Sequence, residues 1–428
     1  MASPPPAAAT PRPAPAPRQG RDRDPVADWA RSGLVPLTGH ADGPPLVPPG
    51  RAATRAVELA GCIAEATGGR VRIDGPRLLS ERAAFTGYTR RGDVSVGGSA
   101  RLLPTADGWA AVSCARPDDV MLLGALVGEE LPTDPWPTLA TRLRRYPGNE
   151  LAELAELLGV AAGPVRLAAV PPALPPPPDP RAGRPVAGLL VVDFSALWAG
   201  PLCAHILGLA GARVVKVETP GRPDGARLGH PEFYRLLHGG HRSVVLDPAD
   251  PAGRRALAAL VAAADIVVEA SRQRALAGFG LDARASAATG TTWISLTAAG
   301  RDSNRVGFGD DVAACAGLVA ADPAGRPVFC GDAIADPLGG LTAAALVLTS
   351  PAGTLLDVGM SDVIAATLTP PPAGAAVTAR RVGDAIVVDT AAGPVPVSCP
   401  RRRRPAGYAP PTGADTVEVL SELRIPAP

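Results

Sequence analysis

A repeated alternation of short apolar runs and alanine-rich segments between residues 186 and 369 constrains the fold of this chain most strongly. GLLVVDFS (188–195) is a continuous apolar run, typical of a strand buried on both faces of a parallel sheet. Gly200 and Pro201 then open a helix, and RVVKVE (213–218) supplies the next strand. Alternating strands and helices predict an α/β fold: a Rossmann-like, mostly parallel sheet with helices on both faces, beside a smaller α+β domain.

The same alternation predicts further strands at 243–247, 265–269, 292–297 and 354–360, with helices at 251–263 and from Asp336 onward. The segment from 100 to 165 reads differently. A hairpin around Asp107–Gly108 is expected there, followed by three helices. We expect the last of these to begin with Asn149 as its N-cap and to stop at Gly159.

Proline-rich stretches suggest where the chain divides. An internal repeat adds one boundary, because Ser32–Val35 and Gly43–Leu46 resemble 316–319 and 325–328. This alignment places Thr54 opposite Asp336. It predicts that 30–66 and 316–349 superpose. The predicted units are a disordered Pro/Ala-rich tail (1–25), a degenerate copy of the segment around Asp336 (26–66), a small α+β domain (67–169), a proline-rich linker (170–185), the Rossmann-like domain (186–369) and a C-terminal segment that returns to it (370–428).

Charge and residue usage exclude several classes of protein. Lys+Arg 42 against Asp+Glu 41 gives a net charge of +1, which argues against a nucleic-acid binder. No apolar run reaches the roughly 18 residues of a membrane-spanning helix, and the N-terminus has no apolar signal core. The six cysteines form no CxxC pair and the histidines follow no zinc-binding spacing, so we expect no metal site. Since the sequence shows no spanning segment or signal core and its cysteines are far apart, we expect no membrane partner and a cytoplasmic location.

Two places could carry chemistry. The first βα turn (195–218) lies where dinucleotide folds bind phosphate, but it lacks the Gly-x-Gly-x-x-Gly spacing, so a nicotinamide site is disfavoured. Asp336, in GDAIADPLGGLTAAALVL, stands at the start of a predicted helix. Such an acid is commonly an N-cap, and one that points into a cleft can serve as a nucleophile.

With these residues in view, the chain resembles the class III CoA-transferases of the formyl-CoA/carnitine type (CaiB/BaiF). The resemblance covers 186–428 and is carried by VVDFSALWAGPLCAHILGLAGARVVKVE (191–218), HRSVVLD (241–247), ADIVVEAS (264–271), GRPVFCGDAIADPLGGLTAA (325–344) and TLLDVGMSDVIAATL (354–368). The order is unusual, because a segment similar to the family's small domain precedes the first strand. The chain therefore looks like a truncated copy fused to a nearly complete one, a permuted variant.

The resemblance implies a CoA-transferase that moves CoA from an acyl-CoA to a carboxylic acid through an aspartyl-CoA intermediate on Asp336. It also implies contacts with CoA at the matching positions, which are Trp198, Thr219, Arg242, Ala270, Ser271 and Phe279. A coenzyme A thioester would then be a substrate, with no permanently bound cofactor and no metal, and a homodimer is possible.

Two other functions stay open. The degenerate first copy and the substituted CoA contacts favour a non-catalytic partner subunit, whereas the retained Asp336 opposes it. An acyl-CoA racemase of this fold would need a histidine partner for the aspartate, and Asp310 stands at that position. An acyl-CoA racemase is therefore the less favoured function.

Overall fold

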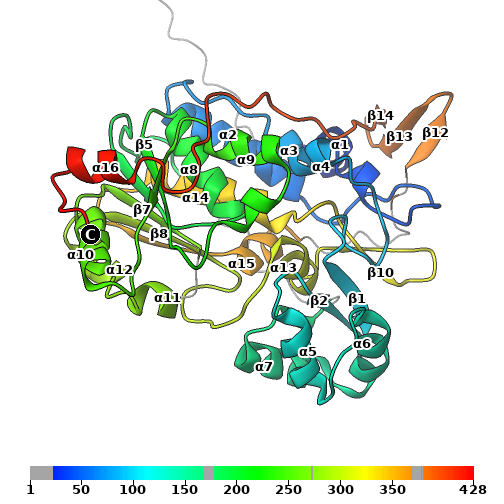
Figure 1. The fold of residues 1–428 in the computed structure, drawn as a ribbon. Coiled ribbons are helices and arrows are strands. Elements are labelled where there is room, and N and C mark those ends of the chain that lie inside the picture. Colours follow the sequence, from blue (N-terminus) through cyan, green and yellow to red (C-terminus); the bar gives the residue numbers. More distant parts are fainter. Residues whose placement is uncertain (1–22, 167–177, 271–272, 369–376, 378) are drawn as a thin grey trace, which may run out of the picture.

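A six-stranded, all-parallel sheet forms the centre of the computed structural model, which describes residues 23–166, 178–270, 273–368, 377 and 379–428 (Figure 1). Its strands are β4 (Leu190–Asp193), β5 (Arg213–Glu218), β6 (Arg242–Val245), β7 (Ile266–Glu269), β8 (Thr292–Thr297) and β11 (Leu355–Gly359). Their order is β11-β8-β7-β4-β5-β6. The predicted fold class is confirmed, and β8 matches its predicted range to the residue.

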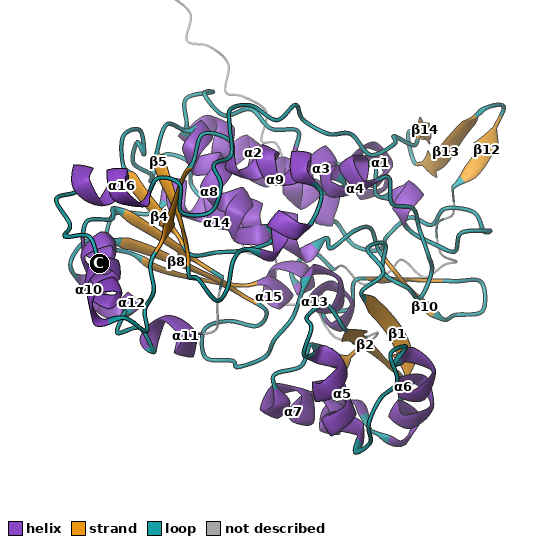
Figure 2. Cartoon of the chain, in the orientation of Figure 1, coloured by secondary structure: helices purple, strands orange, loops and turns teal. Residues whose placement is uncertain are grey.

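Helices cover both faces of this sheet (Figure 2). Along β4, Val191 faces one cluster of buried apolar side chains while Leu190 and Val192 face the other, as the two-residue period of a strand requires. The first cluster packs α8 (Ala199–Leu209), α9 (Pro231–His238) and α14 (Ala335–Thr349) against the sheet, and the second packs α10 (Pro251–Ala262), α12 (Ala283–Ala288) and the C-terminal α16 (Thr416–Glu422).

The N-terminal part packs onto the first of these faces. It comprises α1 (Pro25–Ser32), the 3-10 turn η1 (Val35–Leu37), α2 (Ala52–Ala66), α3 (Gly75–Leu78) and α4 (Glu81–Thr86). Helix α2 lies against α14, and its fully buried Leu59 and Ile63 share one apolar cluster with Leu338 and Leu341 of α14. Thr54 is the third residue of α2 and is also buried. The proposed degenerate repeat stays a prediction.

A small unit with a three-stranded antiparallel sheet lies beside α13 (Gly309–Cys315), at the lower right of Figure 1. It contains β1 (Ala100–Pro104), β2 (Trp109–Ser113), β3 (Ala162–Pro164), α5 (Asp119–Val127), α6 (Trp136–Arg142), η2 (Leu143–Arg145) and α7 (Gly148–Leu158). The hairpin around Asp107–Gly108 is confirmed. Asn149 is not the N-cap of α7: the helix begins at Gly148, whose N–H donates to the Asp107 carboxylate at 2.9 Å. That acid comes from the hairpin, so no local pattern could reveal it.

The remaining elements join these parts. They are η3 (Gly225–Leu228), α11 (Gln273–Ala277), α13 (Gly309–Cys315), the hairpin β9 (Val319–Ala321) and β10 (Pro327–Phe329), α15 (Met360–Ala365) and a small outlying sheet of β12 (Arg380–Val382), β13 (Ala385–Thr390) and β14 (Gly393–Pro396). Within the described ranges, no helix combines the length and apolar character needed to cross a membrane.

Candidate active site

Two helices begin side by side at the carboxyl edge of the sheet. Helix α8 follows β4, and α14 leads back into β11, so the N-termini of both lie at that edge. They pack closely, because a Cβ added to Gly340 would lie only 2.6 Å from the carbonyl oxygen of Ala199. Trp198 precedes α8 as its N-cap residue, and Asp336 is the second residue of α14. The sequence thus brings these two predicted site residues to one end of a helix pair.

The loop that delivers Asp336 has an unusual backbone. Gly331 has φ +72° and Ala333 has φ +46°, the left-handed region that a residue with a Cβ seldom adopts. Gly309, at the start of α13, approaches so closely that a Cβ there would lie 2.5 Å from the Ala333 carbonyl oxygen. Strained residues of this kind persist where the surrounding packing fixes them. The loop is therefore held in one shape directly before Asp336.

Four carboxylates surround this loop, and three of them have donors. Asp310 Oδ1 accepts from the Ala333 N–H at 2.7 Å. Asp311 Oδ1 accepts from the Ser113 hydroxyl at 2.7 Å and from the Phe308 N–H at 2.9 Å. Asp332 is fully buried and forms a bidentate ion pair with Arg82.

The fourth carboxylate, Asp336, differs from these three. Within the part of the chain that the structure describes, it accepts no hydrogen bond, and it keeps partial contact with solvent while its neighbours are buried. A carboxylate that accepts no hydrogen bond and can be reached from solvent is free to attack a substrate.

Burial raises the pKa of three of these four carboxylates. It raises the pKa of Asp336 to about 7, an effect that the charge of Arg82 opposes and that of Asp310 reinforces. Burial and the Asp332 charge likewise raise the pKa of Asp310 to about 7, and burial raises that of Asp311 to about 6. The dipole of α14 favours the ionised form of a carboxylate in its first turn. Burial acts in the opposite direction at Asp336 and outweighs the dipole, so the pKa is raised.

Trp198 lies beside Arg82, the residue that binds Asp332 of this loop. Its side chain is 1% exposed and meets the Phe233 ring edge-on, with ring centroids 5.3 Å apart. Its Nε1–H has no acceptor among the residues described. The guanidinium carbon of Arg82 lies 5.5 Å from the centre of the indole. Trp198 and Arg82 together therefore link the start of α8 to the loop before Asp336.

The other predicted CoA contacts are only partly brought together. Thr219 and Ala270 follow β5 and β7 and so stand at the carboxyl edge; a Cβ on Gly200 of α8 would lie 3.6 Å from that of Ala270. Arg242 is the first residue of β6, away from that edge, and pairs with Glu422 at 2.6 Å and Glu418 at 3.2 Å.

Two predicted contacts remain. Phe279 follows α11 in the chain, is half-buried and packs against the second apolar cluster. Ser271 lies outside the described residues.

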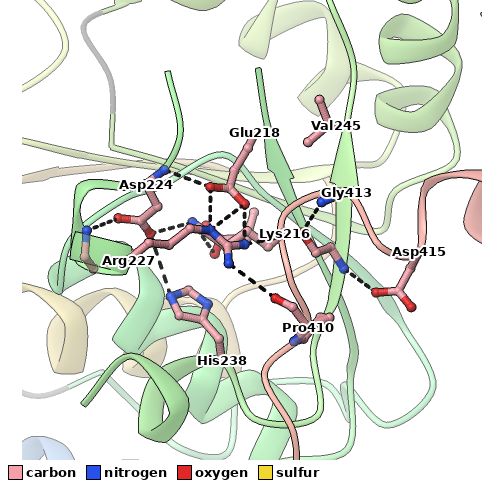
Figure 3. Close-up of polar contacts among 12 residues, drawn as sticks. Lys216, Glu218, Asp224, Arg227, His238, Val245, Pro410, Gly413 and Asp415 are labelled. Carbon is pink, nitrogen blue, oxygen red and sulfur yellow. Dashed lines mark hydrogen bonds and ion pairs between the residues drawn. The ribbon is translucent and has the colours of Figure 1, made fainter. Parts of the chain in front are cut away.

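A buried polar network supports the turn before Trp198 (Figure 3). Asp224 lies 2.9 Å from Lys216 Nζ and accepts from the Leu197 N–H at 2.9 Å, which holds Leu197 at φ +68°. Arg227 pairs with Glu218 and donates to the Pro410 carbonyl. The C-terminal segment is thereby tied to the carboxyl end of β5, as Figure 3 shows.

The histidines of this region are part of that packing. His238 Nε2 lies 3.7 Å from Asp224, and burial, followed by the charge of Lys216, lowers the pKa of His238 well below its usual range. Burial and Lys216 lower the pKa of His241 to about 3. Across the described ranges no three His, Cys, Asp or Glu side chains gather as metal ligands would.

Sequence reasoning missed Arg82. It lies in α4, 250 positions before Asp332, and nothing in the local pattern marks it. A second long-range contact is made by Arg403, which forms an ion pair with the buried Glu81 at 2.8 Å. Both contacts join segments far apart in the chain.

With this geometry in place, comparison with known proteins is informative. The family model described as CoA-transferase family III matches residues 186–391. This part of the chain, the family III segment, is similar to CoA-transferase family III. The recognised resemblance is confirmed for these residues. Two groups that contact the carboxylates of this family III segment, Arg82 and Ser113, lie outside the matched range.

Relatives of the family III segment carry transferase names. A succinate–glutarate CoA-transferase from Agrobacterium fabrum is 29% identical over 216 residues, 44% of this chain and 54% of that protein. The human succinyl-CoA:glutarate CoA-transferase is 29% identical over 174 residues, 37% of this chain and 40% of that protein. A formyl-CoA:oxalate CoA-transferase from Rhodopseudomonas palustris is 36% identical over 89 residues, 19% of this chain and 21% of its own. The chain spans about half the length of the first of these relatives.

Solved structures show weaker overall similarity. A protein from Mycobacterium tuberculosis in an orthorhombic crystal form is 28% identical, with a TM-score of 0.42 over 49% of this chain and 64% of that one. A CaiB/BaiF family protein from Brucella suis is 24% identical, with a TM-score of 0.42 over 48% of this chain and 66% of that one.

Proposed function

We propose that this protein is a CoA-transferase in which Asp336 carries CoA between an acyl-CoA donor and a carboxylic acid acceptor. The observation that carries the proposal is the state of Asp336. It is the carboxylate of the four around its loop that has no hydrogen-bond donor in the described part of the chain and that keeps contact with solvent. The family III match and the names of the relatives support the same chemistry.

The first half of the reaction would load CoA onto Asp336. The ionised carboxylate attacks the thioester carbonyl of the donor, the C–S bond breaks, and CoA leaves as a thiolate, giving a mixed anhydride. The thiolate then attacks the Asp336 carbonyl of that anhydride. The donor's acid departs as a carboxylate, and an aspartyl-CoA thioester remains.

The second half runs these steps in reverse with the acceptor. The acceptor carboxylate attacks the aspartyl-CoA thioester and expels CoA thiolate, which gives a second anhydride. The thiolate attacks the acceptor's carbonyl, so acceptor-CoA forms and Asp336 is released as a carboxylate. The N-termini of α8 and α14, the positive ends of their helix dipoles, lie at this edge and would stabilise the oxyanions formed.

A donor–acceptor screen tests this function directly. Succinyl-CoA and formyl-CoA are each incubated with glutarate, oxalate and unbranched acids of one to six carbons, and the CoA esters are followed by mass spectrometry. We expect at least one acceptor-CoA to form as its donor is consumed, and none with Asp336→Asn. If no pair yields a new CoA ester and no adduct forms on Asp336, the non-catalytic partner subunit is favoured. Exchange of the α-proton with deuterium, without transfer, would indicate a racemase.

A further inference from the structure

Arg82 reaches the candidate site from outside the family III segment. Helix α4 carries it, and its Nε donates to Asp332 Oδ2 at 2.9 Å while Nη2 pairs with Oδ1. Its guanidinium carbon also lies 5.5 Å from the centre of the Trp198 ring. One side chain from the N-terminal part thus contacts both the loop before Asp336 and the residue before α8.

Only one edge of the guanidinium is occupied. Arginine has five N–H donors arranged so that two edges can each bind a carboxylate. The Nε/Nη2 edge binds Asp332, whereas Nη1 has no acceptor among the described residues, and 28% of the side chain is exposed. The neighbouring Trp198 Nε1–H, buried and without an acceptor in the described ranges, is a further unused donor. Buried donors without a protein partner are rare, so these two donors are available to water or to a bound ligand.

The negative charge of this site would repel an anionic acceptor unless a cation offsets it. An acid acceptor is an anion, and it must approach Asp336 through a region that also holds Asp310, Asp311 and Asp332. Like charges at such distances repel in a partly buried site. Arg82 is the cation that acts on Asp310, Asp332 and Asp336 together. Burial would lower its pKa, but the Asp332 charge raises it above its ordinary value, so Arg82 stays charged.

We propose that the open edge of Arg82 binds the carboxylate of the acid acceptor and holds it beside the loaded Asp336, an inference that rests on the proposed function. Arg82 would then be a substrate-binding residue contributed by the N-terminal part of the chain. Its pair with Asp332 fixes the guanidinium in place before the acid arrives, and such pre-ordering strengthens binding. The acceptor's affinity should depend on the guanidinium more strongly than the loading of CoA does, because the free acid binds as an anion whereas the thioester carbonyl of the donor is neutral.

Arg82→Lys separates these two steps, because lysine keeps the charge but loses the planar two-donor edge. Donor succinyl-CoA and acceptor glutarate serve as probes. Loading is measured as the rate at which hydroxylamine traps succinyl-CoA-labelled Asp336, which needs no acceptor. We expect loading within about threefold of the wild type and a KM for glutarate raised at least roughly tenfold, the scale of one charged hydrogen-bonded contact. Arg77→Gln, which removes a surface pair with Asp74, is the matched control and should change neither.

The outcomes separate the two proposals. An unchanged KM for glutarate in Arg82→Lys, or an equal loss of loading and acceptor use, overturns the role of Arg82. A wild type that is never labelled at Asp336 overturns the proposed function, and this inference with it. If Arg82→Lys does not fold, phenylglyoxal modification of the wild type gives the answer. Saturating glutarate should slow modification of Arg82 at least roughly threefold relative to Arg77, and no protection contradicts the proposal.

Discussion

At the scale of single residues, the chemistry of Asp336 is set by how it is buried. Its pKa of about 7 means that the nucleophilic carboxylate increases as the pH rises through neutrality. We therefore expect the rate of Asp336 labelling by acyl-CoA and hydroxylamine to rise between pH 5.5 and 8.5 with a midpoint near 7. The rise should be broad, because Asp310 titrates in the same range and the two charges interact. A rate that is flat across this range, measured by peptide mass, would show that ionisation of Asp336 is not required.

Trp198 gives a second test at this scale. We expect the indole to contact the acyl-CoA, so Trp198→Phe, which keeps an aromatic ring against Phe233, should raise the KM for acyl-CoA roughly tenfold. Trp293→Phe is a matched control, since Trp293 is equally buried and its Nε1–H is also unpaired within the described residues, but it lies in the second apolar cluster. Steady-state kinetics on both variants decide the matter. Equal KM values for acyl-CoA in the two variants would show that Trp198 does not contact the acyl-CoA.

At the scale of elements, the contact between α8 and α14 brings the site together. Gly340→Ala should lower the free energy of unfolding by about 1–3 kcal/mol, because the new methyl group meets the Ala199 carbonyl oxygen and overpacks the helix pair. Gly61→Ala is the control: Gly61 is exposed on α2 with no atom within 4 Å of an added Cβ. It should raise stability by about 0.5–1 kcal/mol through helix propensity. Urea denaturation compares them, and a Gly340→Ala variant as stable as the wild type would contradict this packing.

Elements were also the scale at which the sequence was most informative. The strands of the parallel sheet were predicted to within two residues at each end because their apolar runs are continuous and locally bounded. The N-cap of α7 was missed because its acid, Asp107, belongs to a hairpin 41 positions earlier. Arg82 was missed for the same reason over 250 positions. Contacts between distant segments leave no periodic pattern, and those contacts complete the site.

At the scale of the whole molecule, the N-terminal part is built into the core of the family III segment. Leu59 and Ile63 of α2 cover α14, and Ser113 and Arg82 hold Asp311 and Asp332. We predict that residues 176–428 expressed alone will aggregate, since the α14 face would expose a large apolar patch. Co-expression with residues 1–175 should give a complex that co-purifies and is labelled at Asp336. A soluble 176–428 fragment with the melting temperature of the intact chain would contradict this account.

The central claim, that Asp336 carries CoA, is tested most directly by trapping its acyl intermediate. Wild-type protein is incubated with succinyl-CoA and hydroxylamine, and the peptide containing Asp336 is examined by mass spectrometry. We predict a hydroxamate on Asp336. Asp336→Asn, which preserves the shape of the side chain but removes the anion, should lower transfer by roughly a thousandfold or more without unfolding the protein. Transfer by Asp336→Asn near the wild-type rate, or an adduct on Asp310, Asp311 or Asp332 instead, would contradict the claim.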